Sequence, residues 1–246
     1  KSEVLRELPP KTENVRRVEL ETEQRKLYLA AVVDAREKLR AAKPEDKMTV
    51  FAVLMRLREI CCDPRLVADN WTGSSAKLEA CLELVTEAVA GGHRILLFSQ
   101  FTSMLELLAK RLDEAGVSHF TLQGSTPKPV RAEQVRRFNQ GEADVFLISL
   151  RAGGTGLNLT AADIVIHYDP WWNLAAQNQA TDRAYRIGQR NPVQVYRLIA
   201  QDTIEEKIVE LQQAKQSLAD TVTGGADGAI LSMNPEQLLQ LLGEEA

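Results

Sequence analysis

The chain has 246 residues, enough for a sizeable core, and its 44% hydrophobic and 26% charged residues are typical of a water-soluble globular protein. The net charge of −4 means that any nucleic-acid surface must be a local patch or be completed by another domain. No apolar run is long enough for a membrane span, no signal-peptide core is present, and three cysteines, two of them adjacent, fit a reducing, intracellular compartment.

The first part of the chain is predicted to be mainly helical. Lys1–Pro10 ends in Leu-Pro-Pro and is expected to be an extended linker, and alternating residue types predict a strand over Val15–Leu20. Two helices are expected next, one from Thr22 to a break at Pro44 and one from about Met48 to Cys62. A polar loop then leads into a different pattern.

From Ser75 onward, short apolar runs alternate with amphipathic segments. The expected strands are Ile95–Phe98, Phe120–Leu122, Val145–Ile148, Ile164–Tyr168 and Val193–Leu198. The expected helices are Ala76–Ala90, Ser103–Ala115, Val130–Asn139 and a segment that carries Gln179. Continuous apolar strands separated by helices predict an α/β fold with a parallel sheet covered on both faces.

Ligands of such folds lie at the carboxyl ends of the strands. This rule selects the residues that follow each expected strand: Ser99–Gln100, Gln123–Thr126, Ser149–Arg151, Asp169–Asn173 and the segment after Leu198. These segments are therefore the candidate site.

Three of these segments have specific features and an ordinary alternative each. Ser149–Asn158 contains three glycines that allow close backbone approach to a ligand, or that form a tight strand-to-helix turn. Gln123–Thr126 offers hydroxyls and amides suited to one phosphate, or forms an ordinary capped turn. Asp169–Asn173 contains adjacent tryptophans, of which one is expected to escape the core; it could contact a partner or a nucleic-acid groove, and core packing is the alternative.

The most informative segment is Gln179–Gln189, with the sequence QATDRAYRIGQ. If it is one helix, Gln179, Asp182, Arg183 and Arg186 share an arc of about 100°. Such a face is predicted to bind an anion; the alternative is a solvated face whose arginines form ion pairs with Asp182. The sequence contains neither a Gly-x-x-x-x-Gly-Lys-Ser/Thr phosphate loop nor an Asp-Glu-x-His motif, and its three histidines are scattered, so no metal site is expected.

Taken together and in this order, these segments resemble the second RecA-like lobe of the Swi/Snf-type double-stranded-DNA translocases of helicase superfamily two. The resemblance covers nearly the whole chain. Departures are small: Leu174 stands where the family usually has proline, and Tyr185 where it often has histidine. The helical opening and the DPWWN spelling of Asp169–Asn173 indicate a prokaryotic member. The matching segments are Ile95–Phe101, Leu122–Thr126, Ser149–Leu159, Asp169–Asn173, Gln179–Gln189 and, as the join to a first lobe, Glu7–Glu13.

The resemblance implies half of a DNA-stimulated ATPase. Arg183 and Arg186 would be arginine fingers for the γ-phosphate of ATP, Gln179 would couple nucleotide state to lobe closure, and Asp182 would orient an arginine beside the nucleotide. Near the ribose the resemblance places Gly156 and Asn158. The lysine for the phosphates and the carboxylates for Mg²⁺ would be in the first lobe, so this chain alone is expected to hydrolyse no ATP.

The resemblance also implies contacts to one strand of double-stranded DNA, without sequence readout. The residues concerned are Gln100, Ser125, Thr126, Ser149 and Arg151 for phosphates, with Trp172 rather than Trp171 inserted toward the minor groove. The implied partners are the first lobe of the same protein, DNA and a DNA-bound protein complex, in a cytoplasm or nucleoid, or in a nucleus in a eukaryote.

The expected domains are 1–19 (linker and strand), 20–74 (helical protrusion or brace), 75–215 (RecA-like lobe) and 216–246. The last of these comprises a link around Thr221–Gly228 and a helix from Asn234 to Leu242. Two alternatives stay open: a lobe that only docks DNA or protein, and a different α/β enzyme such as a methyltransferase or a flavodoxin-like protein. The second would need a Gly-x-Gly-x-x-Gly motif after the first strand, which the sequence lacks.

Overall fold

A computed structural model describes residues 8–150, 152, 157–219 and 233–243 of the chain. The chain divides into two compact units. The first contains Lys1–Arg16 and Leu78–Leu198, and the second contains Arg17–Lys77 and Ile199–Ala246.

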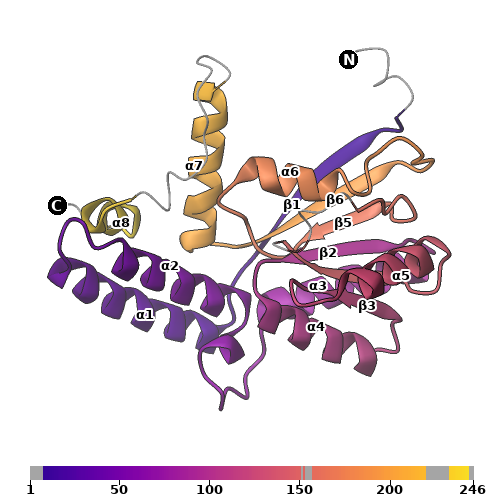
Figure 1. The fold of residues 1–246 in the computed structure, drawn as a ribbon. Helices are drawn as coiled ribbons and strands as arrows, with labels where there is room; N and C mark the ends of the chain where they lie inside the picture. Colours follow the sequence, from indigo (N-terminus) through magenta and orange to yellow (C-terminus); the bar gives the residue numbers. More distant parts are fainter. Residues whose placement is uncertain (1–7, 151, 153–156, 220–232, 244–246) are drawn as a thin grey trace. The chain divides into compact units, whose positions relative to one another are not determined.

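A six-stranded sheet with the order β1-β6-β5-β2-β4-β3 forms the centre of the first unit (Figure 1). The strands are β1 (Lys11–Val18), β2 (Ile95–Ser99), β3 (His119–Leu122), β4 (Val145–Ser149), β5 (Ile164–His167) and β6 (Val193–Ala200). The pairs β2·β4, β2·β5, β3·β4 and β5·β6 are parallel. Where β1 and β6 meet, the backbone N–H of Val193 donates to the carbonyl of Pro10, and that of Gln201 donates to the carbonyl of Val18. The residue numbers of the partners increase together, so β1 and β6 run in the same direction. The sheet is therefore parallel, as predicted.

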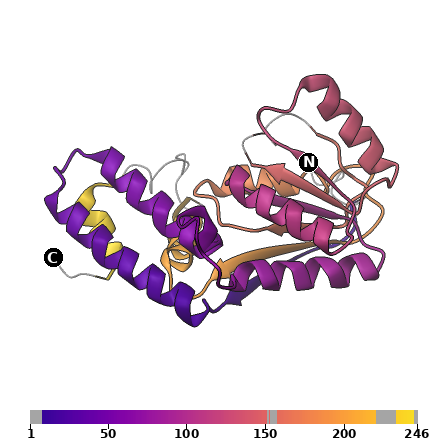
Figure 2. The ribbon, with the colours of Figure 1, turned by 90° about the horizontal axis from the view of Figure 1, so that it is seen from below.

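Helices cover both faces of this sheet (Figures 1 and 2). They are α3 (Ala76–Ala90), α4 (Thr102–Glu114), α5 (Lys128–Asn139) and α6 (Leu174–Thr181). Phe138 of α5 and Ala180 of α6 share a buried cluster with Leu96 and Phe146 of the sheet. Ile95 and Leu97 alternate with Leu96 and Phe98 along β2, so they face the opposite side, which α3 and α4 cover. All five residues of β2 are buried, which explains why the sequence shows a continuous apolar run.

Two expected elements differ from the structure. The first strand is Lys11–Val18 rather than Val15–Leu20, because an exposed edge strand needs no apolar alternation to be stable. The predicted helix through Gln179–Gln189 is wrong: α6 ends at Thr181, and the chain continues as turns through Gly188. Gly188 has a φ of 102°, a conformation that a continuing helix excludes. The helical face on which Gln179, Asp182, Arg183 and Arg186 were expected to lie does not exist.

The second unit contains a pair of long helices that lie side by side (Figures 1 and 2). These are α1 (Thr22–Ala41) and α2 (Lys47–Cys62), followed by the short η2 (Pro64–Leu66), α7 (Ile204–Ala219) and α8 (Pro235–Leu241). Asp46 accepts a hydrogen bond from the backbone of Thr49 and so caps α2. Asn234 and Gln237 form a capping box at α8, and Arg36 of α1 donates to the carbonyl of Leu242. The sequence predicted α1, α2 and α8 but missed α7.

A fully buried ion pair lies in the second unit. Lys77 Nζ is 2.8 and 2.9 Å from the two carboxylate oxygens of Glu205. Glu205 also accepts a hydrogen bond from the backbone of Ala200, at 2.9 Å. Both charged side chains are fully buried, so removal of either partner would take the counter-charge away from a buried group.

Candidate nucleotide and nucleic-acid site

The carboxyl ends of β2, β3, β4 and β5 lie at one edge of the sheet, because these strands are parallel and in register. The expected segments Ser99–Gln100 and Gln123–Thr126 follow β2 and β3 there, and Ser149 and Asp169 end or follow β4 and β5. All of them belong to the first unit. The strand-end rule thus brings these segments to one edge, as expected.

Asp169 holds two of these segments together. Its carboxylate accepts a hydrogen bond of 2.6 Å from the hydroxyl of Ser99, and the backbone N–H of Gln100 lies 3.3 Å from the same oxygen. The Ser99 hydroxyl in turn accepts from the backbone of Phe101, at 3.1 Å. Ser99 and Asp169 are both fully buried. The segment after β5 is therefore fixed to the end of β2 by charge-assisted hydrogen bonds.

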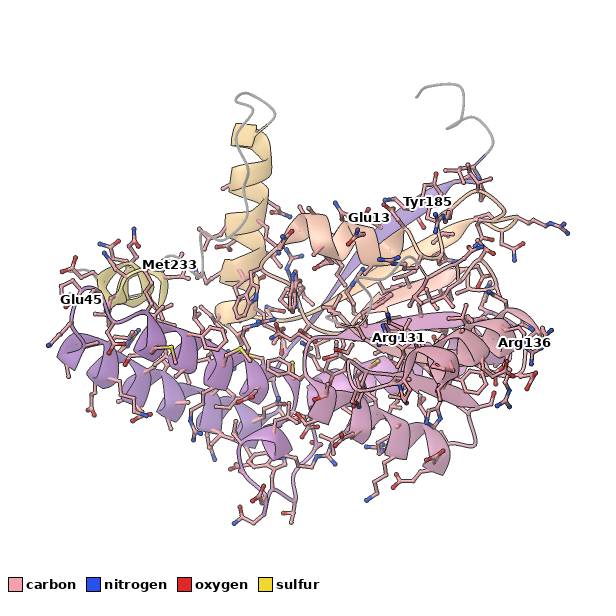
Figure 3. All side chains as sticks on the ribbon, viewed as in Figure 1. Glu13, Glu45, Arg131, Arg136, Tyr185 and Met233 are labelled. Atoms are coloured by element: carbon pink, nitrogen blue, oxygen red, sulfur yellow. The ribbon has the colours of Figure 1, made fainter. Side chains whose placement is uncertain are left out.

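Gln100 and the Gln123–Thr126 turn present polar groups at this edge. The side chain of Gln100 is half-buried, and its Nε2 has no hydrogen-bond partner among the described residues. Ser125 is exposed, whereas the Thr126 hydroxyl accepts from the backbone of Gln123 at 3.0 Å. Arg131 supports the turn by donating to the carbonyl of Thr126 at 3.2 Å, from its position on α5 (Figure 3).

The glycine-rich segment is described in part. Ser149 is buried at the end of β4, and Asn158 is exposed, with its carbonyl accepting from Asn139 at 2.8 Å. Arg151 and Gly156 lie outside the described residues, as does the link at Thr221–Gly228.

The two tryptophans are both half-buried, and their ring centroids are 6.4 Å apart. The backbone N–H of Trp171 donates to the buried side chain of Gln177, at 3.1 Å. Asn173 caps α6 by accepting from Ala176. Neither indole is fully withdrawn into the core, so their exposure does not assign different roles to Trp171 and Trp172.

The segment after α6 carries two arginines in different environments. Arg183 is 5% exposed, and its Nε has no hydrogen-bond partner among the described residues. Arg186 is exposed, as are Gln179 and Asp182. Neither arginine forms an ion pair with a described residue. Burial lowers the pKa of the Arg183 guanidinium, the charge of Arg186 lowers it further, and Asp182 acts in the opposite direction.

Contacts that the sequence did not reveal hold this segment in place. His167, at the end of β5, forms a 2.9 Å hydrogen bond with the hydroxyl of Thr181, where α6 ends. Burial lowers the pKa of His167 to about 3, and the nearby Arg197 lowers it too. The backbone N–H of Leu159 donates to the carbonyl of Arg183, at 3.0 Å. A polar residue in an apolar strand, His167 in Ile-Val-Ile-His, was the one sequence signal for this arrangement.

Tyr185 occupies one of the two positions at which the sequence departs from the family pattern. The ammonium of Lys11 on β1 lies 5.5 Å from the centroid of the Tyr185 ring. Figure 3 shows Tyr185 close to this edge strand. A tyrosine here makes a cation–π contact to the edge strand without changing the charge of the segment.

The described part of the chain contains no group of three or more His, Cys, Asp or Glu residues that could hold a metal ion. Among its helices, none has the length and apolar character that crossing a bilayer requires.

Comparison with known families gives two adjacent matches. Residues 76–188 match the helicase conserved C-terminal domain, and residues 1–66 match the SNF2-related domain. A putative ATP-dependent helicase/translocase of Bacillus subtilis is 39% identical over 246 residues, which is 97% of this chain and 27% of that protein. The chain thus spans about a quarter of the length of the curated relatives that it matches.

Two solved structures from Sulfolobus solfataricus have folds similar to that of this chain. The C-terminal domain of a SWI2/SNF2 ATPase is 27% identical, with a TM-score of 0.78 over 96% of this chain and 100% of that domain. The SWI2/SNF2 ATPase core in complex with double-stranded DNA is 29% identical, with a TM-score of 0.79 over 100% of this chain and 53% of that one. The RecA-like fold class is thereby confirmed.

Proposed function

The chain belongs to the SNF2 family as its helicase C-terminal lobe, and we propose that it is the second motor lobe of an ATP-dependent double-stranded-DNA translocase. In this proposal it supplies arginines to an ATP molecule and contacts to the DNA backbone. The first lobe holds ATP by a phosphate loop, which this sequence lacks. The observation that carries the proposal is the environment of Arg183 and Arg186.

Arg183 is buried and forms no ion pair with a described carboxylate, although the charge of Asp182 acts on it, and Arg186 adds a second positive charge three residues later. An unpaired buried cation beside a like charge is costly in a purely structural arrangement. An anion at this place would relieve that cost, since a guanidinium forms bidentate hydrogen bonds to phosphoryl oxygens. We assign both arginines to the γ-phosphate of ATP, where such groups accelerate hydrolysis by roughly 10³–10⁵.

The remaining nucleotide contacts are assigned by position. Gln179 is exposed two residues before the end of α6, where it can respond to the approach of the other lobe. Asp182 acts on Arg183 through its charge, and Asn158 is exposed on the chain before β5. Gly156 keeps its proposed role beside the ribose. Mg²⁺, when bound, would neutralise phosphate charge from carboxylates of the first lobe.

The DNA contacts are proposed for the same edge of the sheet. Exposed Ser125 and half-buried Gln100 and Thr126 can donate hydrogen bonds to phosphate oxygens. We propose Arg151 for a further phosphate contact and Trp172 for the minor groove. Ser149, which is buried, is also proposed for a phosphate contact. Such contacts position the protein without reading sequence, as a translocase requires.

The test compares the isolated chain with the full-length protein. The isolated chain should hydrolyse no ATP above background with saturating DNA, and the full-length protein should show DNA-stimulated hydrolysis. DNA-stimulated turnover by the isolated chain, abolished by Arg186→Ala, would contradict the proposal. A full-length protein that binds DNA but never hydrolyses ATP would favour a pure docking module.

A further inference from the structure

The side chain of Gln189 uses its whole hydrogen-bonding capacity inside the first unit. Its Nε2 lies 2.7 Å from the carbonyl of Ala162, 3.2 Å from that of Ala184 and 3.3 Å from that of Thr160. Its Oε1 accepts from the backbones of the next two residues, at 2.8 and 2.9 Å. Gln189 is 6% exposed. A side-chain amide, which is both donor and acceptor, is the group that fits this surrounding.

These contacts close the turn that carries Arg186. The Gln189 side chain binds the carbonyl of Ala184, and its backbone N–H donates to the carbonyl of Arg186, at 2.9 Å. Arg186 itself has an exposed side chain without a hydrogen bond to any described residue. The position of its guanidinium therefore depends on the path of the turn from Ala184 to Gln189.

The same side chain ties this turn to the segment that precedes β5. Thr160 and Ala162 lie on that segment, which continues from Leu159, whose N–H donates to the carbonyl of Arg183. Hydrogen bonds therefore hold the turn at Arg183, near its beginning, and at Gln189, at its end. A change at Gln189 would release the Arg186 end while leaving the Leu159–Arg183 bond in place.

We propose that Gln189 is a positioning residue that sets the place of Arg186 for ATP hydrolysis. The proposal rests on the function assigned to Arg186 above and adds the group on which that function depends. Gln189 touches no nucleotide; it acts by fixing the backbone on either side of the arginine. A carboxylate in its place would face carbonyl oxygens instead of donating to them.

The test is a double-mutant cycle in the full-length protein with DNA at saturation. Gln189→Glu should lower kcat by at least about 10-fold, because small displacements of catalytic groups have effects of this order, while KM for ATP stays within about 2-fold. In the Arg186→Ala background, the same substitution should change kcat by less than about 2-fold. Gln213→Glu, on the exposed face of α7, adds the same charge elsewhere and should leave kcat unchanged.

Further readouts separate positioning from loss of folding. Burial among carbonyl oxygens should raise the pKa of the carboxyl that Gln189→Glu introduces. Lowering the pH from about 8 to about 6 should then begin to protonate this carboxyl, restore a donor and raise the kcat of the variant relative to the wild type. Gln189→Met, which cannot titrate, should be equally impaired at both pH values. If Gln189→Glu does not fold, Gln189→Met replaces it in the double-mutant cycle with Arg186→Ala, and its kcat values then test the positioning role.

The outcomes distinguish this proposal from the function it rests on. A wild-type kcat for Arg186→Ala would contradict the role of Arg186 and, with it, the role of Gln189. A lowered kcat for Arg186→Ala, with a further full reduction by the Gln189 substitution, would overturn the positioning role alone. A Gln189→Glu variant with wild-type kcat would overturn it as well.

Discussion

The hydroxyl of Ser99 donates a 2.6 Å hydrogen bond to the carboxylate of Asp169, seventy positions away in the sequence. This bond joins the end of β2 to the segment that carries both tryptophans. Both side chains are fully buried, so water cannot replace either group. Gln100 and Trp172, which we propose as DNA contacts on two different segments, therefore lie close in sequence to the two ends of this bond.

Ser99→Ala should destabilise the protein by about 1–3 kcal/mol, because a buried carboxylate loses its hydroxyl donor and the backbone of Phe101 loses its acceptor. Urea unfolding measures this change. Ser103→Ala, at an exposed position of α4, is the matched control and should lie within about 0.5 kcal/mol of the wild type. Equal midpoints for the two variants would show that the bond contributes no net stability.

Acid should destabilise the protein through His167. Its pKa is about 3 in the fold against an ordinary value near 6.5, so the unfolded chain binds the proton more tightly. The contribution of neutral His167 is fully present above about pH 6.5 and is lost as the pH falls toward 3, at up to about 1.4 kcal/mol per pH unit. His167→Phe cannot titrate, so its unfolding free energy should fall less steeply over this range. Parallel pH profiles for the two proteins would contradict the assignment.

Gly188→Ala should destabilise the turn after α6 by about 1–3 kcal/mol, because the φ of 102° is unfavourable for a residue with a side chain. An added Cβ would meet no atom within 4 Å, so the effect would come from the backbone alone. Gly124→Ala is the control, since that position is equally open and has no positive φ. Thermal unfolding of both variants measures the difference, and an equal effect at the two glycines would refute the explanation.

The buried pair of Lys77 and Glu205 should show strong coupling. Lys77→Met leaves an unpaired buried carboxylate and should cost about 3–5 kcal/mol. Adding Glu205→Gln removes that charge and keeps an acceptor for the backbone of Ala200, so most of the stability should return. Denaturant unfolding of the single and double variants measures the coupling. Additive losses would mean that the two charges do not depend on each other.

The sequence predicted the regular elements well where local pattern decides them. The predicted helix Ala76–Ala90 agrees with α3 at both ends, and every buried strand of the sheet was found, because continuous apolar runs are visible without tertiary information. The edge strand β1 was misplaced, since its residues are mostly exposed and carry no apolar alternation.

The site was predictable only as far as motif order and strand ends allow. Gln179 lies on α6, but Arg183 and Arg186 follow in turns, where helical periodicity was misleading. The turn is set by long-range contacts, His167 to Thr181 and Gln189 to Ala162, that no local pattern encodes. Gln189 was part of the recognised string, but nothing in the sequence indicated that its side chain would close the turn.

The most direct test of the central claim is the kcat of DNA-stimulated ATP hydrolysis by full-length Arg183→Ala and Arg186→Ala variants. In both variants kcat should fall by roughly 10³- to 10⁵-fold. Because these substitutions change neither the phosphate loop proposed for the first lobe nor the residues proposed to contact DNA, both variants should keep DNA affinity within a few-fold of the wild type. Wild-type hydrolysis by both variants would contradict the account and leave this lobe as a docking module.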